Sequence, residues 1–300
     1  KPLKNIIVVK GFNHEVSINM CGIFGFLGFQ DEKLLKRMSQ TIWHRGPDSD
    51  GYFIGNDFSM GMTRLSIIDL DGGTQPIYNE DRTIWIVFNG EIFNYPELRK
   101  DLISRGHNFY TQTDTEVLIH LYEEKGPKLF DDLNGQFAFA IWDKNQEILL
   151  LGRDRMGIRP LFYHHQNGRL VFGSEIKALF TDKKIMRRLD PYSLSDIFTC
   201  WSTLDADTPF DGIYQIPAGH YAQFSRNGLE VHAYWQLPIN GNANYSDLPD
   251  DSLSNWTEEF NALILDAARI RLRADVPVGA YLSGGIDSTF TSALVKKNFN

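Results

Sequence analysis

Short connections between apolar segments constrain the fold of this chain more than any other feature of its sequence. Up to Trp235 the chain alternates between turn signals and segments rich in β-branched and aromatic residues, which are typical of strands. The expected strands are 51–55, 83–90, 136–143, 147–154, 169–175, 220–224 and 230–235. The turn sequences are DKNQE at 143–147, QNGR at 166–169 and SRNGL at 225–229. Because a parallel crossover needs roughly a dozen residues or more, connections this short predict antiparallel pairing.

Helical segments interrupt the strands. They are expected at 31–43, 94–103 and 114–126. In the first of them, Leu34, Leu35, Met38 and Ile42 fall on one face, as in an amphipathic helix. Strands and helices in this mixture predict a layered α+β fold.

A change of composition at 238–252 divides the chain. This stretch is rich in Asn, Asp, Pro and Gly, and it is interpreted as a linker. Apolar residues then recur at helical spacing from Trp256 to Ile270, before an apolar strand at 276–283 and a helix at 289–297. One strand and two helices cannot bury a doubly wound sheet, so this second domain is expected to be truncated.

Composition narrows the class of protein. The 300 residues are 42% hydrophobic and 13% aromatic, enough for ordered cores, and the formal net charge is −8. An acidic chain does not attract phosphate backbones, so no nucleic-acid partner is expected. Cys21 and Cys200 are the only cysteines, which fits a reducing cytoplasm. No apolar run approaches the ~20 residues that span a bilayer, so no membrane association is expected.

The sequence SGGIDS lies where the expected strand near the C-terminal end passes into a helix. Gly284 and Gly285 allow the backbone to approach a ligand closely, and the helix start offers free N–H groups. Ser283 and Ser288 add hydroxyl donors, and Asp287 is a candidate ligand for Mg²⁺. The pattern is typical of a phosphate-binding loop without the lysine of a Walker motif, and a plain strand-to-helix turn is the alternative.

Six motifs together resemble the glutamine-hydrolysing asparagine synthetase family. In chain order they are MCGIFG, HRGPDSDG, RLSIIDL, GEIFNY, GRDRMGIRPLFY and LSGGIDS. The resemblance covers residues 20–300 and implies a class II glutamine amidotransferase domain over 20–237, an N-terminal-nucleophile αββα sandwich of two antiparallel sheets. It also implies the truncated start of an α/β ATP-pyrophosphatase domain over 253–300, whose ATP-binding loop begins at Leu282. Residues 1–19 lie outside the family pattern.

Cys21 is the candidate nucleophile. Its thiolate needs a proton acceptor, which the α-amine of a chain terminus, with a pKa of about 7.7–8.0, can supply. The stretch CGIFGF alone favours a small buried hydrophobe at Cys21. The resemblance implies the nucleophile, although the family's cysteine is the first residue of the mature enzyme and here it follows Met20. Either Met20 is the true start, or the leader is removed as a propeptide.

The remaining glutamine-site residues are implied by the resemblance. Asn89 and Gly90 match an oxyanion-hole pair, and Arg64 matches a clamp on the α-carboxylate of glutamine. Glu91 and Asp114 match the residues that hold the α-amine. The alternatives are a hairpin turn at Asn89–Gly90, a surface cation at Arg64 and a helix N-cap at Asp114. GRDRMGIRPLFY is interpreted as structural, with Arg153 and Asp154 paired.

The function expected is an ATP-dependent amidotransferase. Glutamine would be hydrolysed at Cys21, and the ammonia would pass to an adenylated carboxylate, with aspartate converted to asparagine. The expected substrates and cofactors are glutamine, aspartate, ATP and Mg²⁺, and a homodimer is compatible with them. Two alternatives remain: the same half-reactions with a sugar or cell-envelope acceptor, and a non-catalytic storage or interaction protein.

Overall fold

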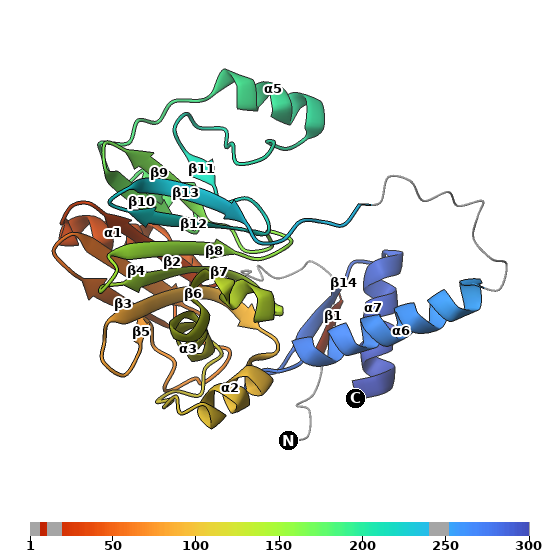
Figure 1. The fold of residues 1–300 in the computed structure, drawn as a ribbon. Helices are drawn as coiled ribbons and strands as arrows, with labels where there is room; N and C mark the ends of the chain where they lie inside the picture. The colour runs from red at the N-terminus through yellow and green to blue at the C-terminus, as the bar shows by residue number, and fades with distance from the viewer. Residues whose placement is uncertain (1–6, 11–19, 240–251, 300) are drawn as a thin grey trace. The chain divides into compact units, whose positions relative to one another are not determined.

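A computed structural model describes residues 7–10, 20–239 and 252–299. The chain divides into two compact units, Ile18–Gln236 and a second unit made of Lys1–Ser17 and Leu237–Asn300 (Figure 1). The strands are β1 (Ile7–Lys10), β2 (Gly22–Leu27), β3 (Ser49–Ile54), β4 (Phe58–Arg64), β5 (Ile77–Tyr78), β6 (Ile84–Ile92), β7 (Gly135–Asp143), β8 (Ile148–Arg153), β9 (Phe162–Gln166), β10 (Arg169–Gly173), β11 (Tyr214–Gln215), β12 (His220–Ser225), β13 (Gly228–Ala233) and β14 (Gly279–Leu282). The α-helices are α1 (Glu32–Thr41), α2 (Tyr95–Ser104), α3 (Glu116–Lys125), α4 (Ile176–Leu179), α5 (Pro191–Cys200), α6 (Ser252–Arg271) and α7 (Ile286–Phe299).

Two antiparallel sheets form the larger unit. Their strand orders are β11-β9-β10-β2-β4-β3 and β13-β12-β8-β7-β6-β5. The predicted hairpins are confirmed: β7 and β8 pair across 143–148, β9 and β10 pair across Asn167–Gly168, and β12 pairs with β13. Asn167 and Gly168 both have positive φ, at 52° and 72°. This conformation matches the right-handed twist of the two strands it joins.

Three apolar cores give the unit four layers. One core lies between the sheets and includes Met60, Val87 and Ala140. A second lies between the outer face of the β6–β8 sheet and α3, and a third between the other sheet and α1 with α4. The order helix, sheet, sheet, helix confirms the predicted α+β sandwich.

Side chains that alternate between the two faces of each strand explain how each sheet contributes to two cores. In β6, Val87 belongs to the central core, whereas its neighbours Ile86 and Phe88 belong to the core under α3. Successive side chains of a strand point to opposite faces, so a strand covered on both sides is apolar throughout. All residues of β2 and β4 are buried, although β4 also contains the polar residues Ser59, Thr63 and Arg64.

The second unit contains β1, β14, α6 and α7. Here β14 pairs in parallel with β1, and Ile7 lies opposite Gly279. The sequence predicted one strand in this unit, and that number is wrong, because Ile7–Lys10 forms a second strand that pairs with β14. The expected linker at 238–252 falls mostly outside the described residues.

Helix α5 was not predicted. Asp190 caps it by accepting a hydrogen bond from Ser193 N at 2.9 Å, and Pro191 occupies its first turn. No helix in the described part of the chain has both the length and the apolar character required to cross a bilayer.

Candidate active site

Cys21 lies immediately before β2 and packs against the core between the two sheets. Because β2 pairs with β4 so that Gly22 faces Thr63, the thiol lies beside the end of β4. The Sγ atom accepts a hydrogen bond from Leu65 N at 3.3 Å and lies 3.5 Å from Leu65 O. Burial raises the pKa of the Cys21 thiol, although the cationic Arg64 and Arg159 act in the opposite direction.

Asn89 and Gly90 lie within β6, so they do not form the hairpin turn that the sequence left as an alternative. The Asn89 side chain is buried, and its Nδ2 has no hydrogen-bond partner among the described residues. A Cβ at Gly90 would come within 2.1 Å of the Gln136 carbonyl oxygen, so only glycine allows β6 to approach β7 this closely. An unpaired amide donor next to a half-buried glycine of the same strand suits an oxyanion hole.

Arg64 is the last residue of β4 and is buried, so the surface-cation alternative is wrong. Its guanidinium donates to the carbonyl oxygens of Ile68, Asp69 and Leu70 at 3.0, 2.7 and 3.3 Å. A Cβ at Gly73 would lie 2.4 Å from Nη2, so the loop closes tightly over the guanidinium. These contacts fix the position of the cation, and its contact with a glutamine carboxylate stays a prediction.

Asp114 is buried, and its Oδ2 accepts a hydrogen bond from Ile92 N at 2.8 Å. The N-cap position of α3 is Thr115, not Asp114. Burial raises the pKa of Asp114 to about 6, against the opposing effects of the Ile92 N–H and the Arg64 charge. The carboxyl group therefore joins the end of β6 to the start of α3.

One pocket brings most of the predicted residues together. Cys21, Arg64, Gly90, Glu91 and Asp114 all line it, whereas Asn89, next to Gly90 in β6, does not. Polar groups of opposite charge thus surround the thiol, as recognition of a zwitterionic amino acid requires.

Arg159 also lines this pocket and was not predicted as a site residue. Its Nη1 contacts the Sδ of Met20, and its buried Nε has no partner among the described residues. The residue belongs to the GRDRMGIRPLFY motif, whose cationic residues could have indicated a role at an anionic site.

That motif also corrects a predicted ion pair. Arg153 donates to backbone oxygens of Gly157, Arg159 and Ile216, and no bond between its side chain and Asp154 is present in the described part of the chain. Asp154 instead accepts backbone N–H groups from Phe137 and from the loop that follows it. Both side chains hold the loop that ends at Arg159, as its structural interpretation predicted.

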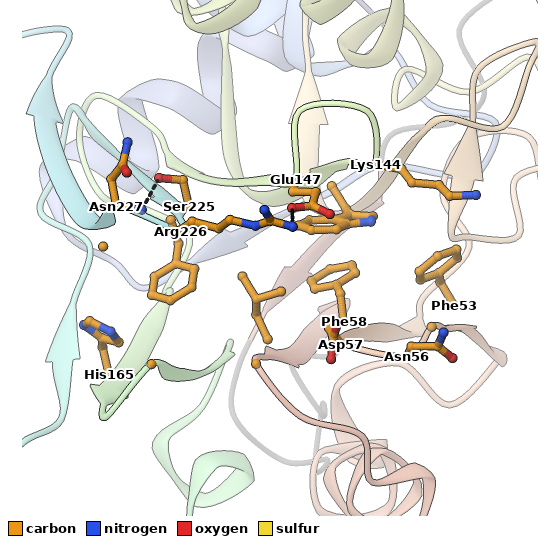
Figure 2. Close-up of a pocket in the computed structure, with 17 residues that line it drawn as sticks. Phe53, Asn56, Asp57, Phe58, Lys144, Glu147, His165, Ser225, Arg226 and Asn227 are labelled. Carbon is orange, nitrogen blue, oxygen red and sulfur yellow. Dashed lines mark hydrogen bonds and ion pairs between the residues drawn. The ribbon is translucent and has the colours of Figure 1, made fainter.

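A larger cavity of about 690 Å³ lies elsewhere in the same unit. Figure 2 shows Phe53, Phe58, Lys144, Glu147, His165 and Arg226 around it, with Glu147 and Arg226 in contact. None of the predicted site residues lines this cavity. Size alone therefore does not identify the reactive site.

The predicted ATP loop connects β14 to α7. Gly284 has φ of +88°, and no heavy atom lies within 4 Å of the position its Cβ would take. The hydroxyls of Ser283 and Ser288 are 2.9 Å apart, and Asp287 lies in the first turn of α7. A left-handed glycine with open space before a helix start, flanked by two hydroxyls, fits a phosphate group.

Comparison with known proteins gives one family match in each of the two units. Residues 20–235 match the profile of the family described as glutamine amidotransferase domain, and residues 259–300 match that of asparagine synthase. "Asparagine synthetase [glutamine-hydrolyzing] 3" of Bacillus subtilis (strain 168) is 38% identical over 289 residues, which are 93% of this chain and 46% of that protein. "Amidase chry2" of Gibberella zeae is 37% identical over 298 residues, 92% of this chain and 43% of that protein. The chain therefore spans less than half the length of these two relatives.

The fold has a counterpart among solved structures. The glutamine phosphoribosylpyrophosphate amidotransferase of B. subtilis matches 72% of this chain and 50% of its own, with a TM-score of 0.54 and 18% identity. At that identity the likeness concerns the fold alone.

Proposed function

Because the chain belongs to the glutamine amidotransferase domain family, we propose that it hydrolyses glutamine at Cys21. The observation that carries the proposal is the single pocket that joins Cys21 to Arg64, Gly90, Glu91 and Asp114. In this assignment Sγ attacks the carbon of the side-chain amide, and ammonia leaves. Water then cleaves the thioester to give glutamate.

Each residue has one role in this reaction. Arg64 binds the α-carboxylate of glutamine, and Glu91 with Asp114 binds its α-ammonium group. Asn89 Nδ2 and Gly90 N–H donate to the oxygen that becomes negative when Sγ adds to the carbon. The neutral thiol that burial favours needs a base, and a free α-amine at Cys21 would supply it.

The role of Met20 follows from this requirement. While Met20 is attached, the nitrogen of Cys21 is a peptide nitrogen and cannot accept a proton. Removal of the preceding residues would also release Arg159 Nη1 from the Met20 Sδ at the pocket. We therefore propose that glutaminase activity requires cleavage between Met20 and Cys21.

A chain with a protease site in place of residues 15–20 tests this proposal within one sample. Glutamate release should be absent before cleavage and present after it. The cleaved Cys21→Ala variant should stay inactive, whereas Cys200→Ala, which changes the other, exposed thiol, should stay active. Equal rates before and after cleavage would contradict the role of the α-amine.

We further propose that the ammonia serves an ATP-dependent amidation of aspartate to asparagine. The match of residues 259–300 to the asparagine synthase family supports this step. Leu282, Ser283, Gly284, Gly285 and Ser288 would hold the phosphates of ATP, with Asp287 on Mg²⁺. When bound, ATP would activate the carboxylate of the acceptor.

A chimaera tests the acceptor. Residues 21–300 would replace the matching part of asparagine synthetase 3 of B. subtilis, and asparagine formation would be measured with glutamine or with ammonia as the nitrogen source. We expect both sources to work, and Cys21→Ala to abolish only the use of glutamine. Glutamine hydrolysis without asparagine formation would favour a different acceptor.

A further inference from the structure

Two histidines and two glutamates meet on the outer side of the β5–β8 sheet, and none of them lines the glutamine pocket. Glu80 lies between β5 and β6, His107 follows α2, and His120 and Glu123 are one turn apart on α3 (Figure 1). One ligand atom from each side chain lies within 4.8 Å of all the others. Three separate segments of the chain thus place four metal-binding side chains together.

Both imidazole rings have the same orientation relative to this cluster. His107 Nδ1 lies 3.6 Å from Glu123 Oε2, whereas its Nε2 lies 3.0 Å from Glu124 Oε1 outside the cluster. His120 Nδ1 lies 2.8 Å from Glu123 Oε2, and its Nε2 lies 3.8 Å from Glu116 Oε1. Each ring therefore presents Nδ1 to the cluster and Nε2 to an outer carboxylate.

This orientation is the one found when histidine binds a metal ion. The ring nitrogen that does not bind the metal donates its proton to a carboxylate, which fixes the tautomer. His120 is 1% exposed, and its Nε2 makes no hydrogen bond in the described part of the chain. Burial lowers the pKa of His120, but the carboxylates of Glu116, Glu123 and Glu80 outweigh this effect and raise the pKa to about 9, so without a metal the ring carries a proton on each nitrogen. A metal ion on Nδ1 would replace one of these protons and leave the other on Nε2, directed at Glu116.

The two carboxylates of the cluster also accept hydrogen bonds from residues outside the cluster. Asn79 Nδ2 donates to Glu123 Oε1 at 2.9 Å, and Asn108 N donates to Glu80 Oε1 at 3.1 Å. In both glutamates the other oxygen, Oε2, faces His120 Nδ1. The outer contacts thus leave one oxygen of each carboxylate directed into the cluster.

We propose that Glu80, His107, His120 and Glu123 bind one divalent transition-metal ion, with Zn²⁺ as the best match. Two imidazoles and two carboxylates suit its four-coordinate geometry, in which ligand atoms are about 3.3 Å apart. The ion joins the β5–β6 connection and the end of α2 to α3. Its role is structural, since it anchors the start of the segment that leads from His107 to Asp114.

The test uses the whole 300-residue chain, stripped with a chelator and then dialysed against Zn²⁺ alone. Metal content by mass spectrometry should be one Zn²⁺ per chain, and Co²⁺ should give the intense visible absorption of a four-coordinate site. His107→Gln and Glu80→Gln should lose this binding. Glu124→Gln, which puts a neutral amide in place of the carboxylate that contacts His107 Nε2 and Arg105, should weaken it by about 10–100-fold.

His232→Gln is the matched control, because His232 also lies beside a glutamate, Glu230, at 3.3 Å but away from the cluster. It should retain the metal. Glu80 is on a surface connection, so Glu80→Gln should fold normally. Its zinc content therefore tests the proposal even if His107→Gln fails to fold. Zinc absent from the wild-type chain, or retained equally by Glu80→Gln and His107→Gln as an adventitious ion only, would overturn the proposal.

Discussion

An amide nitrogen with no partner is costly inside a protein, and Asn89 carries one in the middle of β6. In the proposed reaction this cost is recovered when the substrate oxygen becomes negative. Asn89→Ala should therefore lower kcat by about 10²–10³ and change KM much less. Steady-state glutaminase kinetics on the chain that begins at Cys21 would measure both values. Ser59→Ala removes another buried, unpartnered polar group of the same unit, and it should leave kcat unchanged.

Arg64 should behave in the opposite way. A clamp on the α-carboxylate acts in the ground state and the transition state alike, so Arg64→Ala should raise KM by about 10–100-fold, as expected for the loss of charge-assisted hydrogen bonds. The same steady-state glutaminase kinetics would measure this change in KM. If the KM effect came with Asn89→Ala and the kcat effect with Arg64→Ala, the two roles would be reversed.

Asp114 predicts a pH dependence. Its pKa of about 6 lies above the ordinary value of 3.8, so the native state holds the proton more tightly than the unfolded state. Ionisation of Asp114 therefore costs stability as the pH rises from about 4 to 6, whereas binding of an ammonium group requires the ionised form. Below pH 6, protonation of Asp114 should make the kcat/KM for glutamine fall about tenfold more per pH unit than protonation of the α-amine base alone does. The Asp114→Asn variant should have a low kcat/KM at all pH values and should lack this additional fall below pH 6. The Asp57→Asn variant, which is changed at an exposed turn, should keep it.

At the residue scale, the motifs pointed to residues that share one pocket, whereas local reasoning left several explanations open for each of them. Cys21, Arg64 and Asp114 each had an ordinary structural explanation, and the strand pairing brings them to one pocket. Arg159 was missed because its position depends on the loop that Asp154 folds through backbone hydrogen bonds. Such a contact leaves no periodic pattern in the sequence.

At the element scale, alternation and turn chemistry are local, so the hairpins were predictable. The pairing of β1 with β14 was not, because Ile7 and Gly279 are far apart in the sequence and neither segment alternates clearly. The short helix α5 was missed although Asp190, Pro191 and Ser193 form a recognisable start signal.

The β1–β14 pair gives a prediction at this scale. Deletion of residues 1–10 should speed amide exchange in Gly279–Leu282 by roughly tenfold or more, because these four residues lose their strand partner. Hydrogen exchange with mass spectrometry would detect it. Exchange in β12, which lies in the other unit, is the internal control and should not change. Equal exchange of β14 in the two chains would mean that β1 does not pair with it in solution.

At the scale of the whole molecule, the division into two units separates the two proposed chemistries. The unit Ile18–Gln236 contains the proposed glutamine pocket, three apolar cores and the proposed metal cluster, whereas the proposed phosphate-binding loop belongs to the other unit. A unit with its own cores is expected to fold alone. Limited proteolysis should therefore cut first between Pro238 and Ser252, a stretch rich in Asn, Asp, Gly and Pro, and leave a stable N-terminal fragment.

That fragment provides the last prediction. When Cys21 is its first residue, it should hydrolyse glutamine at the rate of the uncut chain, because every residue assigned to the reaction lies before the cut. Mass spectrometry of the fragments and a glutamate assay on the same time points would follow cleavage and activity together. The Asn89→Ala chain should be cut at the same position and rate, which separates folding from catalysis. Activity that declined in step with cleavage would show that the C-terminal unit is needed to shape the glutamine pocket.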